Sequence, residues 1–332
     1  MSLLDYTKAL LNPTGLTGPS GLPLLPISIA HILALSFAAI YVGSLYVSNH
    51  TRLSFATDVD GKGVSAGVLQ ERERKANERW RDDPDVIRAR LIAVSMASLT
   101  CCTAVEAIIA TSTNATVLEV MNLTRKHLGF TLGSSLRPHL ITPILFLGPL
   151  YATYLQQTLP FQKFWFPKQK FLNLIGLRTY TLGPLTEEIV FRACVLAPYH
   201  LAGCSPTKMV FLTPLSFGLA HAHHAWDTYN RYGRTRQAAL KAVLGSTFQL
   251  IYTTLFGFHA AYLFLRTGSL LPAFSAHAFC NIMGFPEVAY EIRTWPHRKY
   301  LIILLYLLGI VGYVYTLPRW TETPGSIFWP SA

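Results

Sequence analysis

The sequence reads Pro-Leu-Thr-Glu-Glu-Ile-Val-Phe-Arg from Pro184 to Arg192, and it places three ionisable residues in an otherwise apolar part of the chain. Proline is tolerated in the first turn of a helix, and residues 185–197 contain no other helix breaker. The sequence therefore predicts a helix that begins near Leu182. Charged side chains inside such a helix are costly unless they are paired or take part in chemistry.

The spacing of the charges on this helix separates their roles. Glu188 and Arg192 are four residues apart, in the acid-before-base order that favours an ion pair. Glu187 points about 100° away from Glu188 around the helix axis. Arg192 can thus neutralise Glu188, which leaves the carboxylate of Glu187 free for chemistry.

The composition indicates a membrane protein. Of 332 residues, 51% are hydrophobic and only 14% are charged, and the mean hydropathy is +0.33. Residues 26–47 form a run of about 22 residues without Lys, Arg, Asp or Glu, long enough to cross a bilayer. The preceding residues carry a single Lys8 and no small-residue cleavage site, so this run is expected to stay as a membrane span.

Seven further apolar segments follow, several of them interrupted by prolines or polar residues that an isolated lipid-facing helix would avoid. They lie at residues 92–109, 140–159, 177–199, 209–223, 243–265, 270–285 and 301–317. We expect an all-α polytopic protein with about eight transmembrane helices around a cytosol-facing polar cavity. Residues 1–332 would form a single domain, with its motif-bearing core at about 179–286 and a charged cytosolic loop at 48–90.

The net charge of +11 follows the predicted topology. Most of the 28 Lys and Arg residues lie in the loops after the first, third, fifth and seventh segments. The positive-inside rule places these loops in the cytosol and both termini on the far side. This distribution argues against a nucleic-acid partner. Residues 71–90 are expected to form a solvated helix on the cytosolic surface, with anionic lipid as a secondary contact.

A second group of polar residues ends the fifth segment, in Phe217-Gly218-Leu219-Ala220-His221-Ala222-His223-His224. Three histidines invite a zinc site, but the chain contains no His-Glu-x-x-His motif, and His223 and His224 lie where the segment becomes polar. We therefore expect no metal at this position. His221 is the stronger functional candidate, because Phe217 at i−4 can pack against its ring and hold it.

The sixth and seventh segments add more polar groups. His277 and Asn281 are four residues apart and share one helix face, so an imidazole and a carboxamide lie side by side. Gln249, Thr253 and His259 of the sixth segment are expected to bond across helices more than to touch a ligand.

Together these side chains form a set suited to activating water against a carbonyl group. Glu187 and His221 would polarise the water and move its proton. His277 and Asn281 would donate hydrogen bonds to the oxyanion. Glu188 and Arg192 would orient the helix that carries Glu187.

Three motifs in this order resemble those of the CAAX-protease and bacteriocin-processing family. They are Glu-Glu-x-x-x-Arg from Glu187, Phe-x-x-x-His from Phe217 and His-x-x-x-Asn from His277. The Pro-Leu-Thr-Glu-Glu form of the first motif and the count of eight segments look like the eukaryotic branch, the type II CAAX prenyl endopeptidases. The likeness covers residues 179–286, and each motif is specific only in combination with the others.

The resemblance implies a glutamate-type intramembrane protease of the endoplasmic reticulum membrane, without metal or other cofactor, whose active site faces the cytosol. It would remove the last three residues of farnesylated or geranylgeranylated CAAX proteins such as small GTPases. Carried over by position, Glu187 and His221 are the water-activating pair, and His277 and Asn281 the oxyanion pair. The roles of His223, His224, Gln249 and His259 stay open.

Two other functions account for parts of the pattern. A polytopic transporter or proton-coupled channel would also carry Glu, Arg and His within the membrane. A thiol protease could use Cys280, three residues after His277, although no adjacent cation is expected to stabilise its thiolate. Ion flux without peptide cleavage would indicate the first, and loss of cleavage on replacing Cys280 the second.

Overall fold

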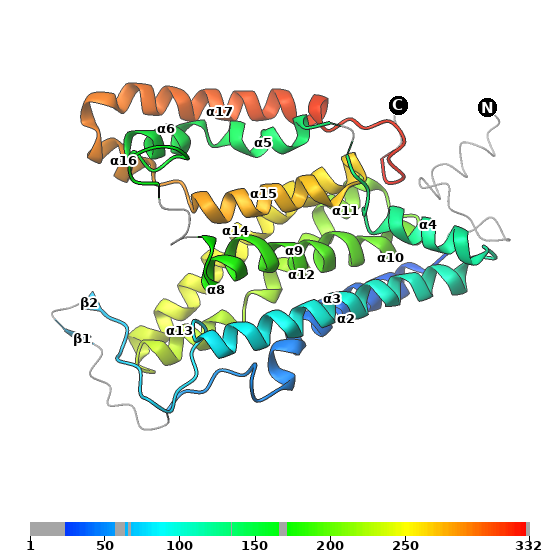
Figure 1. Cartoon of the computed structure of the whole chain (residues 1–332), viewed down its shortest axis with the longest axis horizontal. Coiled ribbons are helices and arrows are strands. Elements are labelled where there is room, and N and C mark those ends of the chain that lie inside the picture. Colours follow the sequence, from blue (N-terminus) through cyan, green and yellow to red (C-terminus); the bar gives the residue numbers. More distant parts are fainter. Residues whose placement is uncertain (1–23, 57–63, 66–67, 134, 166–170, 330–332) are drawn as a thin grey trace.

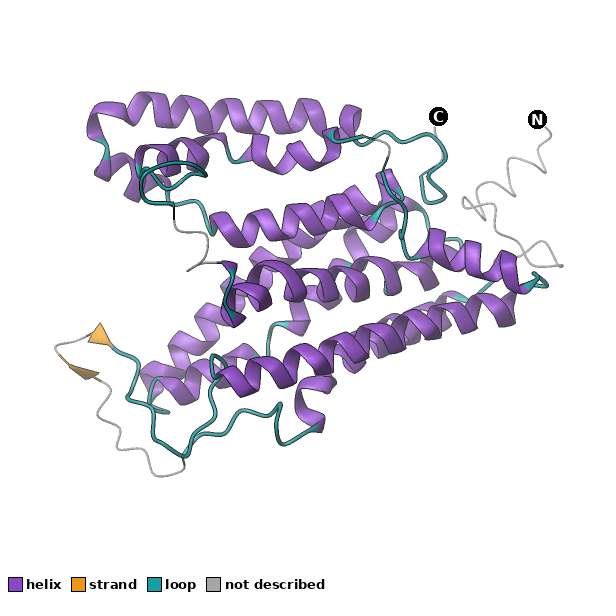
Figure 2. Ribbon diagram, viewed as in Figure 1, coloured by secondary structure: helices purple, strands orange, loops and turns teal. Residues whose placement is uncertain are grey.

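The computed structural model describes residues 24–56, 64–65, 68–133, 135–165 and 171–329. Figure 2 shows helices over most of this part of the chain and one pair of very short strands, β1 (Val64–Ser65) and β2 (Val68–Leu69), which are antiparallel. The N-terminal residues around Lys8 lie outside the described part. The predicted all-α class is confirmed.

In chain order, the helices are α2 (Ile27–Val47), α3 (Pro84–Ser112), α4 (Val117–His127), α5 (Arg137–Leu145), α6 (Leu147–Leu155), α8 (Leu174–Gly176), η1 (Leu177–Leu182), α9 (Gly183–Glu188), η2 (Ile189–Cys194), α10 (Leu196–Leu201), α11 (Pro206–Leu212), α12 (Pro214–Ala220), α13 (His224–Arg231), α14 (Arg236–Thr267), α15 (Leu270–Met283), α16 (Val288–Thr294), η3 (Pro296–Arg298) and α17 (Lys299–Trp320).

Within the described residues, four helices are long and apolar enough to cross a membrane: Ile27–Val47, Pro84–Ser112, Arg236–Thr267 and Pro296–Trp320. The polytopic class is therefore confirmed, but the expected count of eight spans is not. The other four apolar segments consist of shorter helices. Their prolines explain the breaks, because a proline removes one backbone hydrogen bond from a helix and clashes with the preceding turn.

The third apolar segment illustrates such a break. It consists of α5 and α6, which meet at Phe146, three residues before Pro149. Pro149 has no N–H to bond the carbonyl of Leu145. On the neighbouring α17, a Cβ added at Gly309 would lie 2.9 Å from that carbonyl oxygen, so the glycine permits the close approach of the two helices.

The elements form layers in Figure 1, with α17 lying along α5 and α6 on one side and α2 beside α3 on the other. Between them lie α15 and the continuous helical stretch of η1, α9, η2 and α10, called the Glu helix from this point on. The long α14 contacts α12, α13 and α15. The most completely buried apolar side chains include those of the Glu helix from Val190 to Ala197, which places this helix at the centre of the core.

The Glu helix does not begin near Leu182 as expected, because helical backbone already starts with α8 and η1. In η1 the N–H of Gly183 bonds the carbonyl of Arg178, five residues earlier, which is the π-helical pattern. A Cβ at Gly183 would lie 2.2 Å from that carbonyl oxygen, so a side chain there would clash. The wider turn accommodates Pro184 inside the helix, and a second π-helical segment, η2, follows Glu188.

The charged loop after the first membrane helix also differs from the expectation. Residues 71–83 are irregular instead of helical, and α3 begins only at Pro84. The loop is organised by the buried carboxylate of Glu78, which accepts hydrogen bonds from Arg72 at 2.9 and 2.5 Å and from the N–H groups of Ala56 and Lys75 at 2.7 and 3.0 Å. A carboxylate with so many donors favours a closed loop over a helix. Residues 57–63 and 66–67 of the same loop lie outside the described part.

The loop is attached to α13 by charged and backbone contacts. Arg72 donates its backbone N–H to the carbonyl of Arg231 at 3.0 Å and its Nε to the carbonyl of Asn230 at 2.9 Å. The side chain of Arg231 pairs with Glu71. Arg231 also lies over the ring of Trp80, with its Cζ 5.0 Å from the centroid, and Arg81 lines a small pocket with His223, His224 and Asp227, so this part of the loop lies near the start of α13.

Glu78→Gln is expected to loosen this loop. Burial by itself raises the pKa of Glu78, but the hydrogen bonds from Arg72 and from the N–H groups of Ala56 and Lys75 outweigh it and lower the pKa from 4.5 to about 2. We expect the variant to lower the free energy of local opening by about 2 kcal/mol, and the amides of residues 71–83 to exchange about 30-fold faster at pH 7. Hydrogen exchange measures this.

The pH dependence has a definite sign. Because the pKa of Glu78 is lowered in the folded loop, its stabilisation is fully present above pH 4.5 and disappears as the pH falls from 4.5 through about 2. In the Gln variant, this part of the pH dependence should be absent. Glu73→Gln, at an exposed carboxylate in the same loop, serves as the control. Equal exchange in wild type and the Glu78 variant would contradict the assignment.

Candidate active site

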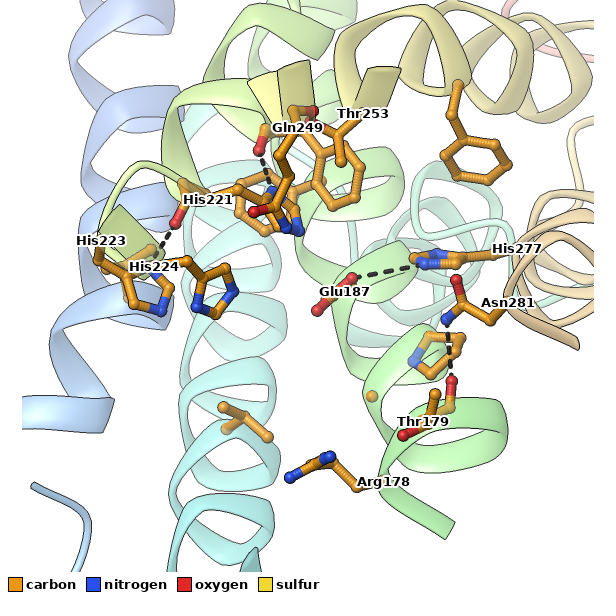
Figure 3. A pocket seen from close by; sticks show the side chains of 18 of the residues that line it. Arg178, Thr179, Glu187, His221, His223, His224, Gln249, Thr253, His277 and Asn281 are labelled. Atoms are coloured by element: carbon orange, nitrogen blue, oxygen red, sulfur yellow. Dashed lines mark hydrogen bonds and ion pairs between the residues drawn. The ribbon is translucent and has the colours of Figure 1, made fainter. Parts of the chain in front are cut away.

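A pocket of about 450 Å³ opens among α2, α3, the Glu helix, α12, α14 and α15 (Figure 3). Glu187, His221, His277 and Asn281, the residues proposed from sequence, all line it. Figure 3 shows Glu187 at its centre, between His221 on one side and His277 with Asn281 on the other. Tertiary folding therefore brings together four side chains from three separate helical segments.

The expected ion pair between Glu188 and Arg192 is present. Nε of Arg192 lies 3.0 Å from Oε2 of Glu188, and both side chains are almost completely buried. The guanidinium also lies over the rings of Phe217 and Phe256, with its Cζ 4.2 and 5.7 Å from their centroids. Among the described residues, its N–H groups have no partner in hydrogen-bond geometry. Opposite charge and cation–π contacts therefore hold this buried cation.

His277 contacts both glutamates, an arrangement that its sequence spacing did not indicate. Its Nδ1 lies 2.7 Å from Oε1 of Glu188, and its Nε2 lies 3.6 Å from Oε2 of Glu187. An ionised carboxylate only accepts hydrogen bonds, so Nδ1 of His277 carries the hydrogen shared with Glu188. Glu188 thereby links Arg192 to the His277 ring and fixes the orientation of that ring beside Glu187.

His221 lies just after α12, and its orientation is also fixed. Its Nδ1 donates to the carbonyl of Phe217 at 2.8 Å, because a carbonyl oxygen can only accept. The ring of Phe217 packs edge-on against it with centroids 4.8 Å apart, the contact expected from their spacing. In the neutral ring, the free lone pair is then on Nε2, which is the nitrogen that a general base needs.

Asn281 is held by a hydrogen bond to the Glu helix. Its Nδ2 donates to the carbonyl of Thr179 at 2.8 Å. In the π-helical pattern of η1 this carbonyl would bond the N–H of residue 184, but Pro184 has none. The proline of the first motif thus leaves an acceptor that the asparagine of the third motif occupies, and the second hydrogen on Nδ2 is left for another acceptor.

Comparison with known proteins identifies the family. A sequence model described as "Type II CAAX prenyl endopeptidase Rce1-like" matches residues 169–283. The chain is 36% identical over 236 residues to "Probable CAAX prenyl protease 2" of Schizosaccharomyces pombe, covering 71% of this chain and 81% of that protein. It is 32% identical over 302 residues to "CAAX prenyl protease 2" of Homo sapiens, covering 87% of this chain and 80% of the human protein.

The chain belongs to the type II CAAX prenyl endopeptidase family. A third relative, "CAAX prenyl protease 2" of Arabidopsis thaliana, is 39% identical over 145 residues, which is 44% of each chain. No solved structure gives a significant match. The family match spans the Glu helix, α12, α14 and α15, and it includes all four proposed catalytic residues.

The two histidines that follow the second motif, His223 and His224, also line the pocket. Nδ1 of His223 donates to the carbonyl of Ala220 at 2.7 Å, and the rings of His223 and His224 lie 4.1 Å apart. The centroids of His221 and His224 are 5.9 Å apart. Within the part of the chain that the structure describes, no group of three or more His, Cys, Asp or Glu side chains is arranged to hold a metal ion.

The polar residues of α14 divide between two roles. Gln249 and Thr253 line the pocket, and the hydroxyl of Thr253 donates to the Gln249 carbonyl at 2.7 Å. His259 lies away from the pocket, where Nε2 contacts the Thr142 hydroxyl at 2.9 Å and Nδ1 the Tyr313 hydroxyl at 3.0 Å. These bonds join α14 to α5 and α17, so the expected bonding across helices holds for His259.

Several pocket residues carried no functional signal in the sequence. Tyr41 of α2 reaches the pocket and hydrogen-bonds the Thr186 hydroxyl at 3.0 Å. Arg81, Arg90 and Arg178 line it as well. In the sequence, these arginines count only among the positive charges that distinguish the loops on one side of the membrane from those on the other. Only the folded chain shows that they face the same cavity as Glu187.

Proposed function

We propose that this protein is an endopeptidase that removes the C-terminal tripeptide from farnesylated or geranylgeranylated CAAX proteins, small GTPases among them. The bond cleaved would be the amide after the prenylated cysteine. We place the protein in the endoplasmic reticulum membrane with the pocket facing the cytosol, where such substrates are made. The observation that carries the proposal is the position of Glu187 between His221 and His277 in one pocket of a chain from this family.

The proposed chemistry begins with a water molecule held between Glu187 and Nε2 of His221. Glu187 is suited to this role because Arg192 pairs with Glu188 instead. As the water oxygen attacks the carbonyl carbon, its proton passes to Glu187 or His221. The same proton then goes to the amine of the leaving tripeptide as the carbon–nitrogen bond breaks. No covalent intermediate with the protein is required.

The negative charge that develops on the carbonyl oxygen needs donors on the opposite side of Glu187. Asn281 can supply the N–H of Nδ2 that Thr179 does not use. His277 already donates from Nδ1 to Glu188, so its Nε2 can donate only when the ring carries hydrogen on both nitrogens. One donor of this kind contributes about 2.7–4 kcal/mol in other acyl-transfer enzymes.

The pocket also offers an apolar wall for an isoprenoid chain. The rings of Phe248 and Tyr252 on α14 pack against Phe285, with centroids 5.3 and 5.9 Å apart. All three line the pocket, and Phe248 and Phe285 are more than half exposed. Aromatic rings that line a pocket and stay accessible fit a hydrocarbon ligand, whose burial is favourable by about 25 cal/mol per Å².

The test is cleavage of a farnesylated CAAX peptide by the purified protein in detergent, with a metal chelator present and the tripeptide product identified by mass spectrometry. We expect cleavage after the farnesylated cysteine in the presence of chelator. Cys280→Ala should retain activity within about threefold of wild type, because both nitrogens of His277 face carboxylates and do not activate the thiol.

Three results would change the assignment. Loss of cleavage on chelation, restored by zinc, would indicate a zinc site that includes His223 and His224. Complete loss in Cys280→Ala would favour the thiol protease. Absence of cleavage by folded wild-type protein, together with ion-dependent flux in liposomes, would favour the transporter.

A further inference from the structure

Three arginines line the pocket that contains Glu187, and the proposed chemistry uses none of them. Arg81 belongs to the loop before α3, Arg90 to the first turns of α3, and Arg178 to η1. Arg81 and Arg90 also line a smaller adjoining pocket with Asp227. In the larger pocket, cations converge from two parts of the chain that are about 90 residues apart in sequence. Such a cluster needs an explanation, because like charges repel.

The three guanidinium groups differ in how they are paired. Nη1 of Arg178 donates to the backbone carbonyl of Arg81 and to Oδ1 of Asp82, both at 3.0 Å. Nε of Arg90 donates to the carbonyl of Thr51 at 2.8 Å. For the Arg81 guanidinium, no hydrogen bond or ion pair is found with any residue that the structure describes. Arg178 thus holds the backbone of Arg81 and leaves the Arg81 charge free.

The surroundings of Arg81 favour an anion. Burial, followed by the positive charge of Arg178, lowers the pKa of the Arg81 guanidinium, and the carboxylates of Asp82, Asp227 and Glu187 offset this only in part. The group stays protonated, since arginine does not lose its proton in proteins. A half-buried cation in this position gains from a ligand carboxylate, which it can bind through two parallel N–H···O contacts.

The position of Arg178 on the Glu helix allows the distance between the arginines and Glu187 to be estimated. It precedes Glu187 by nine residues on one helical stretch, which corresponds to about 13 Å along the axis at 1.5 Å per residue. Figure 3 shows its side chain directed into the pocket from the end away from Gln249 and Thr253. Three extended residues span about 10 Å. A tripeptide whose first amide lies at Glu187 would therefore place its last carboxylate near these arginines.

We propose that Arg81, supported by Arg90 and positioned by Arg178, binds the C-terminal carboxylate of the CAAX substrate. This carboxylate subsite rests on the proposed function. It would explain why the cleaved bond lies three residues from the C-terminus of the substrate. Cleavage would occur three residues from the chain end because the rise of about 13 Å from Arg178, which bonds the backbone of Arg81, to Glu187 accommodates three extended residues of about 10 Å. The free charge lies in the cavity that holds Glu187, which favours a peptide carboxylate over the headgroup of an anionic lipid.

The experiment compares two substrates on three proteins in nanodiscs of neutral lipid. The substrates are a farnesylated CAAX peptide with a free C-terminal carboxylate and the same peptide as a C-terminal amide. The proteins are wild type, Arg81→Gln and the control Arg88→Gln, at an exposed arginine of α3 that does not line the pocket. Initial rates give kcat/KM for each pair.

For wild type and the Arg88 variant, we expect kcat/KM to be about 30-fold higher for the acid than for the amide. Arg81→Gln should lower kcat/KM for the acid to the level of the amide and leave the amide rate almost unchanged. The loss should lie mainly in KM, since the carboxylate is bound in both ground and transition states. This substrate dependence separates recognition of the carboxylate from a structural role of Arg81.

Each remaining outcome would overturn the subsite. Equal kcat/KM for acid and amide in wild type would refute it while leaving the endopeptidase function intact. An equal loss for both substrates in Arg81→Gln would show a structural role. A loss that appears only when anionic lipid is added would indicate a headgroup site. Failure of wild type to cleave either peptide would refute the proposed function, and the subsite with it.

Discussion

Glu187→Gln is expected to lower kcat for cleavage of a farnesylated CAAX peptide by about 1,000-fold. The amide has nearly the same shape as the carboxylate but cannot take a proton from water. Glu187 is also the carboxylate of the pair that Arg192 does not neutralise, and it lies at the centre of the pocket in Figure 3. The measurement is the single-turnover rate with enzyme in excess, which isolates the chemical step.

The matched control is Glu106→Gln, which removes a carboxylate from α3 outside the pocket and should leave the rate within about twofold. Binding of a farnesylated, non-cleavable peptide reports whether the Glu187 variant is folded, and its affinity should stay near that of wild type. A Glu187 variant that binds the peptide and retains more than a tenth of the wild-type rate would show that another group activates the water.

Arg192→Met is expected to destabilise the protein by about 3–5 kcal/mol, because it leaves the buried carboxylate of Glu188 without a countercharge. The guanidinium fills the space between Glu188 and the rings of Phe217 and Phe256, and methionine can occupy much of this volume without the charge. Unfolding in mixed micelles with increasing dodecyl sulfate measures the loss. Cleavage should fall as well, since Glu188 also orients His277.

The double variant Glu188→Gln, Arg192→Met distinguishes charge from packing. With both charges removed, we expect at least about 2 kcal/mol of the lost stability to return. Cleavage should stay about tenfold or more below wild type, because His277 then faces an amide in place of the carboxylate. If the double variant is no more stable than Arg192→Met, the loss of stability comes mainly from lost side-chain packing. The explanation by an unpaired charge on Glu188 would then be wrong.

The local part of the site followed from helix periodicity. Residues four apart lie on one helix face, so the contacts between Glu188 and Arg192 and between Phe217 and His221 were predictable from spacing, and the structure contains both. The membrane class followed in the same way from apolar content and from the length of residues 26–47. These features depend on neighbours within one turn or on composition, which a sequence displays directly.

Helix continuity was harder to predict. The apolar segments were recognisable, yet the third, fourth and fifth consist of several helices or contain π-helical turns, and the loop at residues 71–83 is not helical. Whether a segment forms one continuous helix depends on where its buried polar groups, and the backbone groups that a proline leaves unbonded, find hydrogen-bond partners. Glu78 organises its loop with donors from Arg72 and Ala56, and the π-helical turn at Gly183 accommodates Pro184, which no hydropathy pattern encodes.

By itself, the sequence determined the class of the protein, its motifs and the pairing of residues within each helix. Only the tertiary structure decided that His277 bridges Glu187 and Glu188, that Asn281 bonds the Thr179 carbonyl, and that Arg81 lines the same pocket as Glu187. The physical reason is range. Contacts within a helix repeat with its period, whereas contacts between helices depend on how the whole bundle packs and on which buried charges must be paired.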